Sequence, residues 1–200
     1  MNPPTITIII IAVLLITLAL IGCRGYRMSS SEAAIYAAER ERKAQILKIT
    51  DICIAHIRKY EGFSADPYNE ALPGEDPRWY YGYGHRIYNY DPNKHVSITL
   101  DDANYLMRTD FNNCLQAVPE HYDIELNEYQ RHAIALFIYN VGANKWIRKS
   151  TMYQMLSGIK PYDERKFKEF WMLWNKTNGK VNDRLTERRA FEVGLYFRKP

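Results

Sequence analysis

Hydrophobic and polar positions divide the chain into an uncharged N-terminal run, a polar stretch and a long segment with helical periodicity. Residues 5–22 carry no charge and suffice to cross the hydrocarbon core of a bilayer as a helix, which needs roughly 17 to 25 residues. Residues 24–45 begin with a serine run and become rich in Ala, Glu, Arg and Lys, which favours a polar linker and then an exposed helix capped by Ser31. We therefore expect a membrane-directed segment 1–23, a linker 24–45 and a globular domain 46–200.

Apolar side chains of this domain recur every three or four positions in four stretches, the pattern of amphipathic helices. The first predicts a helix over about residues 46–60, and the second predicts a helix that starts at Thr99, just before two aspartates. The four stretches are followed by residues that end helices, namely Gly62, Pro119, Gly142 and the pair 178–179 (Asn-Gly). We expect the remainder of the domain outside residues 63–92 to be helical.

Residues 63–92 are rich in Pro, Tyr and Gly, a composition that predicts a small β-hairpin or meander. No repeat of 20 to 50 residues is visible, so repeat architectures are excluded. The expected fold class is α+β, with a small β lobe beside a larger helical lobe and a cleft between them, preceded by the apolar N-terminal helix.

Composition and charge narrow the picture further. The 200 residues are 46% hydrophobic, enough for one ordinary core, and we expect a monomer. The formal net charge of +4 suits a polyanionic partner, but the lysines and arginines form no stripe, which argues against nucleic acid. Cys23, Cys53 and Cys114 lack zinc-ligand spacing, so we expect no metal. A disulfide between Cys53 and Cys114 and two free thiols are both open.

The fate of residues 5–22 has two interpretations. One is a signal anchor that stays in the membrane. The other is a lipoprotein signal, since Leu-Ile-Gly before Cys23 is similar to a lipobox. Arg24 and Arg27 follow the apolar run and no basic residue precedes it, which by the positive-inside rule would leave the domain in the cytoplasm. Orientation must therefore be argued from function.

Candidate chemistry gathers around the end of the first helix and the region after it. Hydrolysis of a glycosidic bond needs one carboxyl group that donates a proton and a second carboxylate that activates water or stabilises positive charge on the sugar. Partial burial favours the protonated form of a carboxyl group, so Glu61, at the end of an apolar helix, is a suitable acid. The second carboxylate would come from the hairpin across the cleft.

These motifs resemble the phage-type lysozymes of glycoside hydrolase family 24. The family pattern is a Glu-Gly that ends the first helix, a Tyr seven residues after this Glu, an Asp two further on, and a Thr-Ile-Gly-x-Gly-His strand. Here Glu61 and Gly62, Tyr68 and residues 82–85 (Gly-Tyr-Gly-His) match it. The resemblance spans about residues 50–198 and continues through residues 126–130, 137–142, 150–151 and 188–190.

Two positions depart from this pattern. Glu70 stands where the family has Asp, and Tyr80 stands where it has a Thr that helps to place the attacking water. About four extra residues lie within residues 71–78. We expect Glu70 to be the second catalytic carboxylate, with Asp66 and Asp76 as the alternatives.

Four further residues are candidates for substrate binding, namely Tyr80, His85, Asn140 and Arg184. His85 is also suited to a structural hydrogen bond at the base of the hairpin. Asn140 is similar to a family position that lines the sugar cleft. Arg184 shares a helical face with Arg188 and Leu195, so at least one arginine should point to the apolar side and need a carboxylate partner. Arg184 would either pair with Glu61 or brace the terminal helix.

The resemblance implies a lysozyme that hydrolyses the β-1,4 bond between N-acetylmuramic acid and N-acetylglucosamine of peptidoglycan, without a cofactor. The alternatives are a peptidoglycan-binding relative that has lost activity and a lytic transglycosylase. Because this substrate lies beyond the inner membrane, we expect the segment 1–23 to hold the domain facing the periplasm or cell wall. If the chain is phage-encoded, the membrane would be the host cell inner membrane.

Overall fold

The computed structural model describes residues 29–71, 74–88, 91, 95–119 and 122–199. The chain divides into two compact units, with the boundary between Ala44 and Gln45. No helix of the described residues is long and apolar enough to cross a membrane. The predicted apolar helix 5–22 and Cys23 lie outside the described residues, so the expectation for them stays a prediction.

Helix α2 (Ser30–Glu61) contributes to both units, and side chains 29–44, in the first unit, are all exposed. The Ser29 hydroxyl accepts a hydrogen bond from the Glu32 backbone N–H at 3.2 Å, and the Glu32 carboxylate accepts one from the Ser29 N–H at 2.9 Å. Ser29 therefore caps the helix, and the expectation of a cap at Ser31 is wrong, because Ser31 already lies in the first turn.

The second unit contains the predicted meander, an antiparallel sheet in the order β1-β2-β3. Its strands are β1 (Ser64–Asn69), β2 (Trp79–Gly82) and β3 (His85–Ile87). Gly82 has a φ of 62°, and a Cβ at this position would lie 3.2 Å from the Cβ of Ala103. A glycine is required here because the chain takes a left-handed conformation while the sheet packs closely on the next helix.

Two capped helices follow the sheet. Helix α3 (Leu100–Gln116) begins with a capping box between Thr99 and Asp102, which confirms the predicted start. Helix α4 (Glu128–Val141) begins with a similar box between Asn127 and Gln130 and ends at Gly142, as the apolar pattern predicts.

The remaining helices are α5 (Ala143–Lys149), α6 (Thr151–Leu156), α7 (Glu164–Met172) and α8 (Asp183–Tyr196). A short hairpin separates the last two, with strands β4 (Lys176–Thr177) and β5 (Lys180–Val181). The expectation that this stretch is helical is wrong. Asn178 and Gly179 both have positive φ, the geometry of a tight hairpin turn that an Asn-Gly pair favours.

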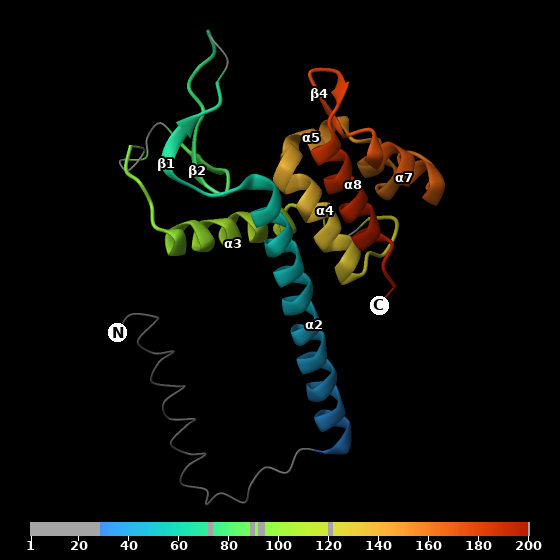
Figure 1. Ribbon diagram of the computed structural model, residues 1–200. Coiled ribbons are helices and arrows are strands. Elements are labelled where there is room, and N and C mark those ends of the chain that lie inside the picture. Colours follow the sequence, from blue (N-terminus) through green and yellow to red (C-terminus); the bar gives the residue numbers. More distant parts are fainter. Residues whose placement is uncertain (1–28, 72–73, 89–90, 92–94, 120–121, 200) are drawn as a thin grey trace, which may run out of the picture. The chain divides into compact units, whose positions relative to one another are not determined.

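Helix α4 forms the centre of the core and packs against α8 (Figure 1). Its residues 132–138 are all buried, and Phe137 makes edge contacts with the rings of Trp146 and Trp171. Trp171 is fully buried. This packing fixes α8 beside the end of α2, where the candidate site lies.

Cys53 and Cys114 are both free, so the disulfide that the sequence left open is not formed. Burial raises the pKa of the Cys53 thiol well above its ordinary value and that of Cys114 to about 12. Neither thiol has the thiolate character of a nucleophile or metal ligand. Among the described residues, no group of three His, Cys, Asp or Glu side chains could hold a metal ion.

Candidate active site

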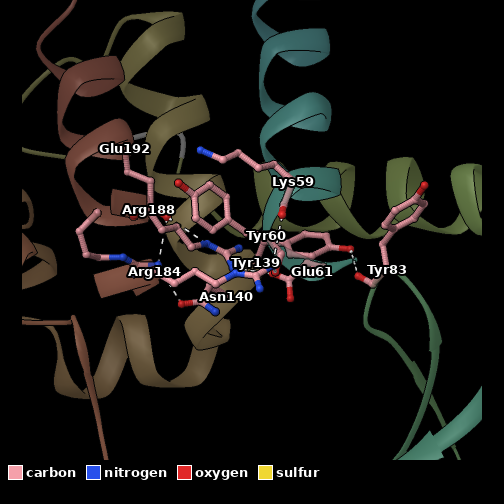
Figure 2. Close-up of polar contacts among 10 residues, drawn as sticks. Lys59, Tyr60, Glu61, Tyr83, Tyr139, Asn140, Arg184, Arg188 and Glu192 are labelled. Atoms are coloured by element: carbon pink, nitrogen blue, oxygen red, sulfur yellow. Dashed lines mark hydrogen bonds and ion pairs between the residues drawn. The ribbon is translucent and has the colours of Figure 1, made fainter. Parts of the chain in front are cut away.

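Glu61 is the last residue of α2, and its side chain is 23% exposed. One carboxylate oxygen, Oε1, accepts a hydrogen bond from Nη1 of Arg188 at 2.5 Å. The other oxygen lies against the turn between β2 and β3, because a Cβ added to Gly84 would be 3.9 Å from Oε2. The two oxygens thus have different surroundings, a buried guanidinium on one side and the sheet turn on the other (Figure 2).

Arg184, one helical turn before Arg188, holds the backbone that carries Glu61. Its Nη2 donates to the carbonyl oxygens of Tyr60 at 2.5 Å and Lys59 at 3.2 Å (Figure 2). These carbonyls belong to the last turn of α2, where backbone acceptors have no partner within the helix. Of the two roles that the sequence left open, pairing with Glu61 therefore falls to Arg188, and Arg184 braces α2 rather than its own helix.

A cluster of buried charges lies behind Arg188. Arg189 and Glu192 are fully buried, and Arg188 is 2% exposed. Glu192 Oε1 is 3.1 Å from Arg189 Nη2 and 3.5 Å from Arg188 Nε, while Oε2 accepts from the Trp171 indole N–H at 2.9 Å. Burial raises the pKa of Glu192, against the opposing effect of the two guanidiniums, and it lowers the pKa of Arg189 to about 10. Buried charges of this kind must be paired, and here each has a partner.

Two residues at the end of α4 join this cluster to the sheet. The side-chain oxygen of Asn140, a predicted substrate-binding residue, accepts from Nη2 of Arg189 at 2.8 Å. Asn140 itself is exposed. The hydroxyl of Tyr139 donates to the Tyr83 carbonyl at 2.9 Å. Burial raises the pKa of Tyr139 well above its ordinary value, so this phenol keeps its proton and the bond.

The other predicted carboxylate, Glu70, follows β1 and is exposed. Burial raises the pKa of the Tyr68 phenol, and the negative charges of Glu70 and Glu61 raise it further. Both carboxylates therefore act on the same hydroxyl. Tyr80, opposite Tyr68 in the sheet, stacks on its ring at 5.9 Å, and its hydroxyl accepts from Arg86 at 3.1 Å.

The alternative carboxylates have different surroundings. Asp66 accepts a hydrogen bond from the Ser97 hydroxyl at 2.5 Å, which ties β1 to the segment before α3. Asp76 is an exposed residue before β2. Glu70 differs from both, because its charge acts on the Tyr68 phenol together with that of Glu61.

A cleft of about 520 Å³ lies between the sheet and the helices. His85 and Gly84 line it from the sheet, Asp110 from α3 and Tyr139 from α4. Nδ1 of His85 is 2.7 Å from a carboxylate oxygen of Asp110, so this histidine makes the structural hydrogen bond expected at the hairpin base and also faces the cleft. The predicted cleft between the two lobes is therefore present, and Glu61 adjoins it at Gly84, although neither Glu61 nor Glu70 lines it.

Sequence reasoning expected one arginine of this face to need a carboxylate partner without choosing Arg188, and it missed the roles of Arg189, Glu192 and Asp110. The spacing of Arg188 and Glu192, four residues apart on a helix with an apolar face, was a signal for the buried pair. No local pattern linked Asp110 to His85, which lies 25 residues away.

The small sheet, the helical lobe, the cleft between them and the arginine-bound Glu at the end of the first domain helix define a lysozyme-like α+β protein. The model of the phage lysozyme family matches residues 58–192. The chain belongs to this family.

Individual relatives agree with this assignment. The chain is 30% identical over 152 residues to an endolysin of Bacillus phage B103 and 29% identical over 150 residues to an endolysin of Bacillus phage PZA. Each match covers 75% of this chain but only 54% and 55% of the relatives, so the chain spans about half of their length. The muramidase domain of SpmX from Asticaccaulis excentricus has a similar fold, with a TM-score of 0.59 at 24% identity over 74% of this chain and 96% of that domain.

Proposed function

We propose that this chain is a muramidase that hydrolyses the β-1,4 bond between N-acetylmuramic acid and N-acetylglucosamine in peptidoglycan. The observation that carries the proposal is the placement of Glu61. Arg188 donates to Oε1, which leaves Oε2, at the turn of Gly84, as the oxygen that can carry a proton towards substrate. Membership of the phage lysozyme family and the endolysin relatives support the same reaction.

In the proposed reaction, Glu61 gives its proton to the glycosidic oxygen as the bond from this oxygen to the anomeric carbon breaks. The released sugar leaves with a new hydroxyl group, and Glu61 becomes a carboxylate that Arg188 stabilises. Positive charge develops on the ring that keeps the anomeric carbon. Water supplies a hydroxyl to this carbon and a proton that restores the acid.

Glu70 has the second role in this scheme, because its negative charge stabilises the positive sugar or orients the water. Tyr68 lies under the influence of both carboxylates, which supports a shared site. Tyr80 stacks on Tyr68 where the family has a shorter Thr. A carboxylate displaced by about 1 Å can cost roughly 100-fold in rate, so we expect real but modest activity. The reaction needs no cofactor.

The sugar chain would lie along the cleft between the sheet and the helices. His85 and Tyr139 line the cleft, and Asn140 is exposed at the adjoining end of α4. Arg184, which the sequence placed among the substrate-binding residues, acts instead through the backbone of α2 in this scheme.

The test is digestion of purified cell wall by the full-length chain, with the sugar ends identified by mass spectrometry. We expect reducing N-acetylmuramic acid ends. Glu61→Gln should lower the rate at least about 1000-fold, because an amide cannot donate the proton. The control is Glu169→Gln, which removes an exposed carboxylate of α7 that pairs with Arg165 and should keep wild-type activity.

Other outcomes would contradict the proposal. Ends of the 1,6-anhydro type would identify a lytic transglycosylase, in which the muramoyl 6-hydroxyl replaces water. Wall binding without released fragments would identify an inactive relative. If Glu61→Gln keeps a tenth of the wild-type rate with an unchanged melting temperature, Glu61 is not the acid.

A further inference from the structure

The charges behind Glu61 alternate in sign. The Arg188 guanidinium lies between two carboxylates: Nη1 donates to Glu61 at 2.5 Å, and Nε is 3.5 Å from Glu192 (Figure 2). Arg189, fully buried, is 3.1 Å from the same Glu192 oxygen. Two buried positive charges are therefore shared between one fully buried carboxylate, Glu192, and one that is partly exposed, Glu61.

This arrangement affects the proton on Glu61. Positive charge close to a carboxyl group favours its ionised form, and a buried guanidinium is screened little by water. Without a counterion, Arg188 and Arg189 would together hold Glu61 as a carboxylate, which cannot act as an acid. The guanidiniums of Arg188 and Arg189 favour the ionised form of Glu192 against the effect of burial, and this negative charge offsets their effect on Glu61 from the far side of Arg188.

We propose that Glu192 is a positioning residue for the acid: by balancing Arg188 and Arg189 it sets the pH range in which Glu61 keeps its proton. This inference rests on the proposed function. In the proposed reaction, Glu192 does not contact the substrate. Its carboxylate is fixed by the Trp171 indole N–H, which donates to Oε2 at 2.9 Å, and it lies one turn beyond Arg188 on α8.

The buried titratable side chains on the neighbouring elements are neutral near pH 7 and do not alter the charge balance between Glu192 and the two arginines. Burial raises the pKa of Tyr139 on α4 and of Tyr68 on β1, so both phenols are neutral near pH 7. Burial, followed by the charges of the nearby arginines, lowers the pKa of His56 on α2 to about 3, so this imidazole is neutral too. Outside the buried cluster, Glu70, Lys59 and Arg184 are exposed, and Asp110 of α3, whose charge acts on Tyr139 together with that of Glu61, is paired with His85.

Among the described residues, the groups that act on the pKa of Glu192 are the two arginines and the neutral Trp171. Burial, and after it the negative charge of Glu192, raise the pKa of the Cys53 thiol on α2, so this thiol stays protonated. Trp171 of α7 is a neutral donor. A change at Glu192 therefore reaches Glu61 through Arg188 and Arg189.

The test is the pH dependence of wall hydrolysis by the full-length chain. Glu192→Gln keeps the shape of the side chain and an acceptor for Trp171 but removes the charge. The basic limb of the pH profile, where kcat falls as Glu61 loses its proton, should therefore move to lower pH by about one unit, with KM nearly unchanged. Arg189→Gln should move the limb to higher pH. The double variant should return it close to the wild-type position. Glu192→Asp, which keeps the charge, and Glu169→Gln, the exposed control on α7, should leave it in place.

A second readout is independent of activity. The ¹³C resonance of the Glu61 carboxyl group, assigned by its loss in Glu61→Gln, can be titrated by NMR in each variant, and it should follow the same shifts. If the wild-type chain does not cut cell wall, the proposed function fails while this titration still tests the charge balance.

Unchanged titration of Glu61 in Glu192→Gln would overturn the inference, as would a fall in kcat with no change in the limb. If Glu192→Gln does not fold, Arg189→Gln and the double variant decide, since replacing a buried ion pair by neutral groups is commonly tolerated. If the basic limb of the pH profile of kcat is displaced in the double variant, the proposed charge balance is wrong.

Discussion

At the scale of single residues, the site depends on which oxygen of each carboxylate accepts a hydrogen bond. Glu61 uses Oε1 to bind Arg188 and presents Oε2 to the sheet turn. Asp66, by contrast, uses one oxygen to bind Ser97, an ordinary structural contact. Glu70 acts on Tyr68 together with Glu61. These contacts assign different tasks to three carboxylates that are equivalent in composition.

We expect Glu70→Gln to lose most of the wall-cleaving activity, about 100-fold or more, because the amide can neither stabilise positive charge nor take a proton from water. Asp66→Asn and Asp76→Asn, measured in the same turbidity assay, should stay within a few-fold of wild type. If one aspartate variant is inactive and Glu70→Gln is not, the extra residues before β2 have moved the second carboxylate to that aspartate.

At the scale of elements, the end of α2 is the part that must be held still. The helix ends at Glu61, and the carbonyl oxygens of Lys59 and Tyr60 accept from Arg184 of α8. The sheet approaches from the other side through the Gly84 turn. Glu61, the proposed acid, is thus positioned by α2, by α8 and by the turn between β2 and β3.

Removal of the Arg184 contact should loosen this helix end. We expect Arg184→Met to lower the free energy of unfolding by about 1 kcal/mol, the order of a hydrogen bond from a charged donor at an exposed site. It should also lower kcat about 10-fold or more, since Glu61 is the next residue after the released carbonyls. Urea unfolding and the wall assay measure the two effects.

The matched control for this variant is Arg165→Met, which removes an exposed arginine from α7 that pairs with Glu169. It should change neither stability nor rate appreciably. Equal behaviour of the two variants would show that Arg184 is an ordinary surface arginine.

At the scale of the whole molecule, burial of titratable groups couples stability to pH. His56 stacks on Phe191 at 4.0 Å and is 5% exposed, and its pKa falls from 6.5 to about 3. Between these values the unfolded chain binds a proton that the folded chain does not, so the free energy of unfolding falls as the pH is lowered.

His56→Phe isolates this effect, since a phenyl ring can keep the stacking on Phe191 and has no proton to bind. Relative to wild type, we expect this variant to gain about 2 kcal/mol of stability when the pH is lowered from 7.5 to 5. Urea unfolding at the two pH values provides the measurement. A pH-independent difference between the two proteins would contradict the buried neutral imidazole.

The N-terminal segment bears on where the protein lies in the cell. We propose that residues 5–22 direct the domain out of the cytoplasm, despite Arg24 and Arg27 on the wrong flank, because the proposed substrate lies outside. A C-terminal alkaline phosphatase fusion should be active in cells, and an inactive fusion would contradict this. Cys23→Ser should change the processed mass if the chain is a lipoprotein, and leave it unchanged if residues 5–22 are a retained anchor.

Most elements of the domain could be predicted because their signals are local. Apolar spacing predicted α3 and α4, and the capping box at Thr99 marked where α3 begins. The β4–β5 hairpin was missed although Asn178 and Gly179 are a strong local turn signal, because the pair was interpreted as a helix stop. The cap at Ser29 was misplaced by two residues within a run of serines that are chemically equivalent.

The sequence by itself determined that Glu61 ends a helix, that a small sheet follows it, and that arginines occupy one face of the last helix. Which arginine meets Glu61 was decided by the tertiary structure alone. Arg184 and Arg188 are one turn apart on α8, so helical periodicity puts both on the same face. Only the packing of α8 against α4 fixes its position along the end of α2, and this position gives the backbone carbonyls to Arg184 and the carboxylate to Arg188.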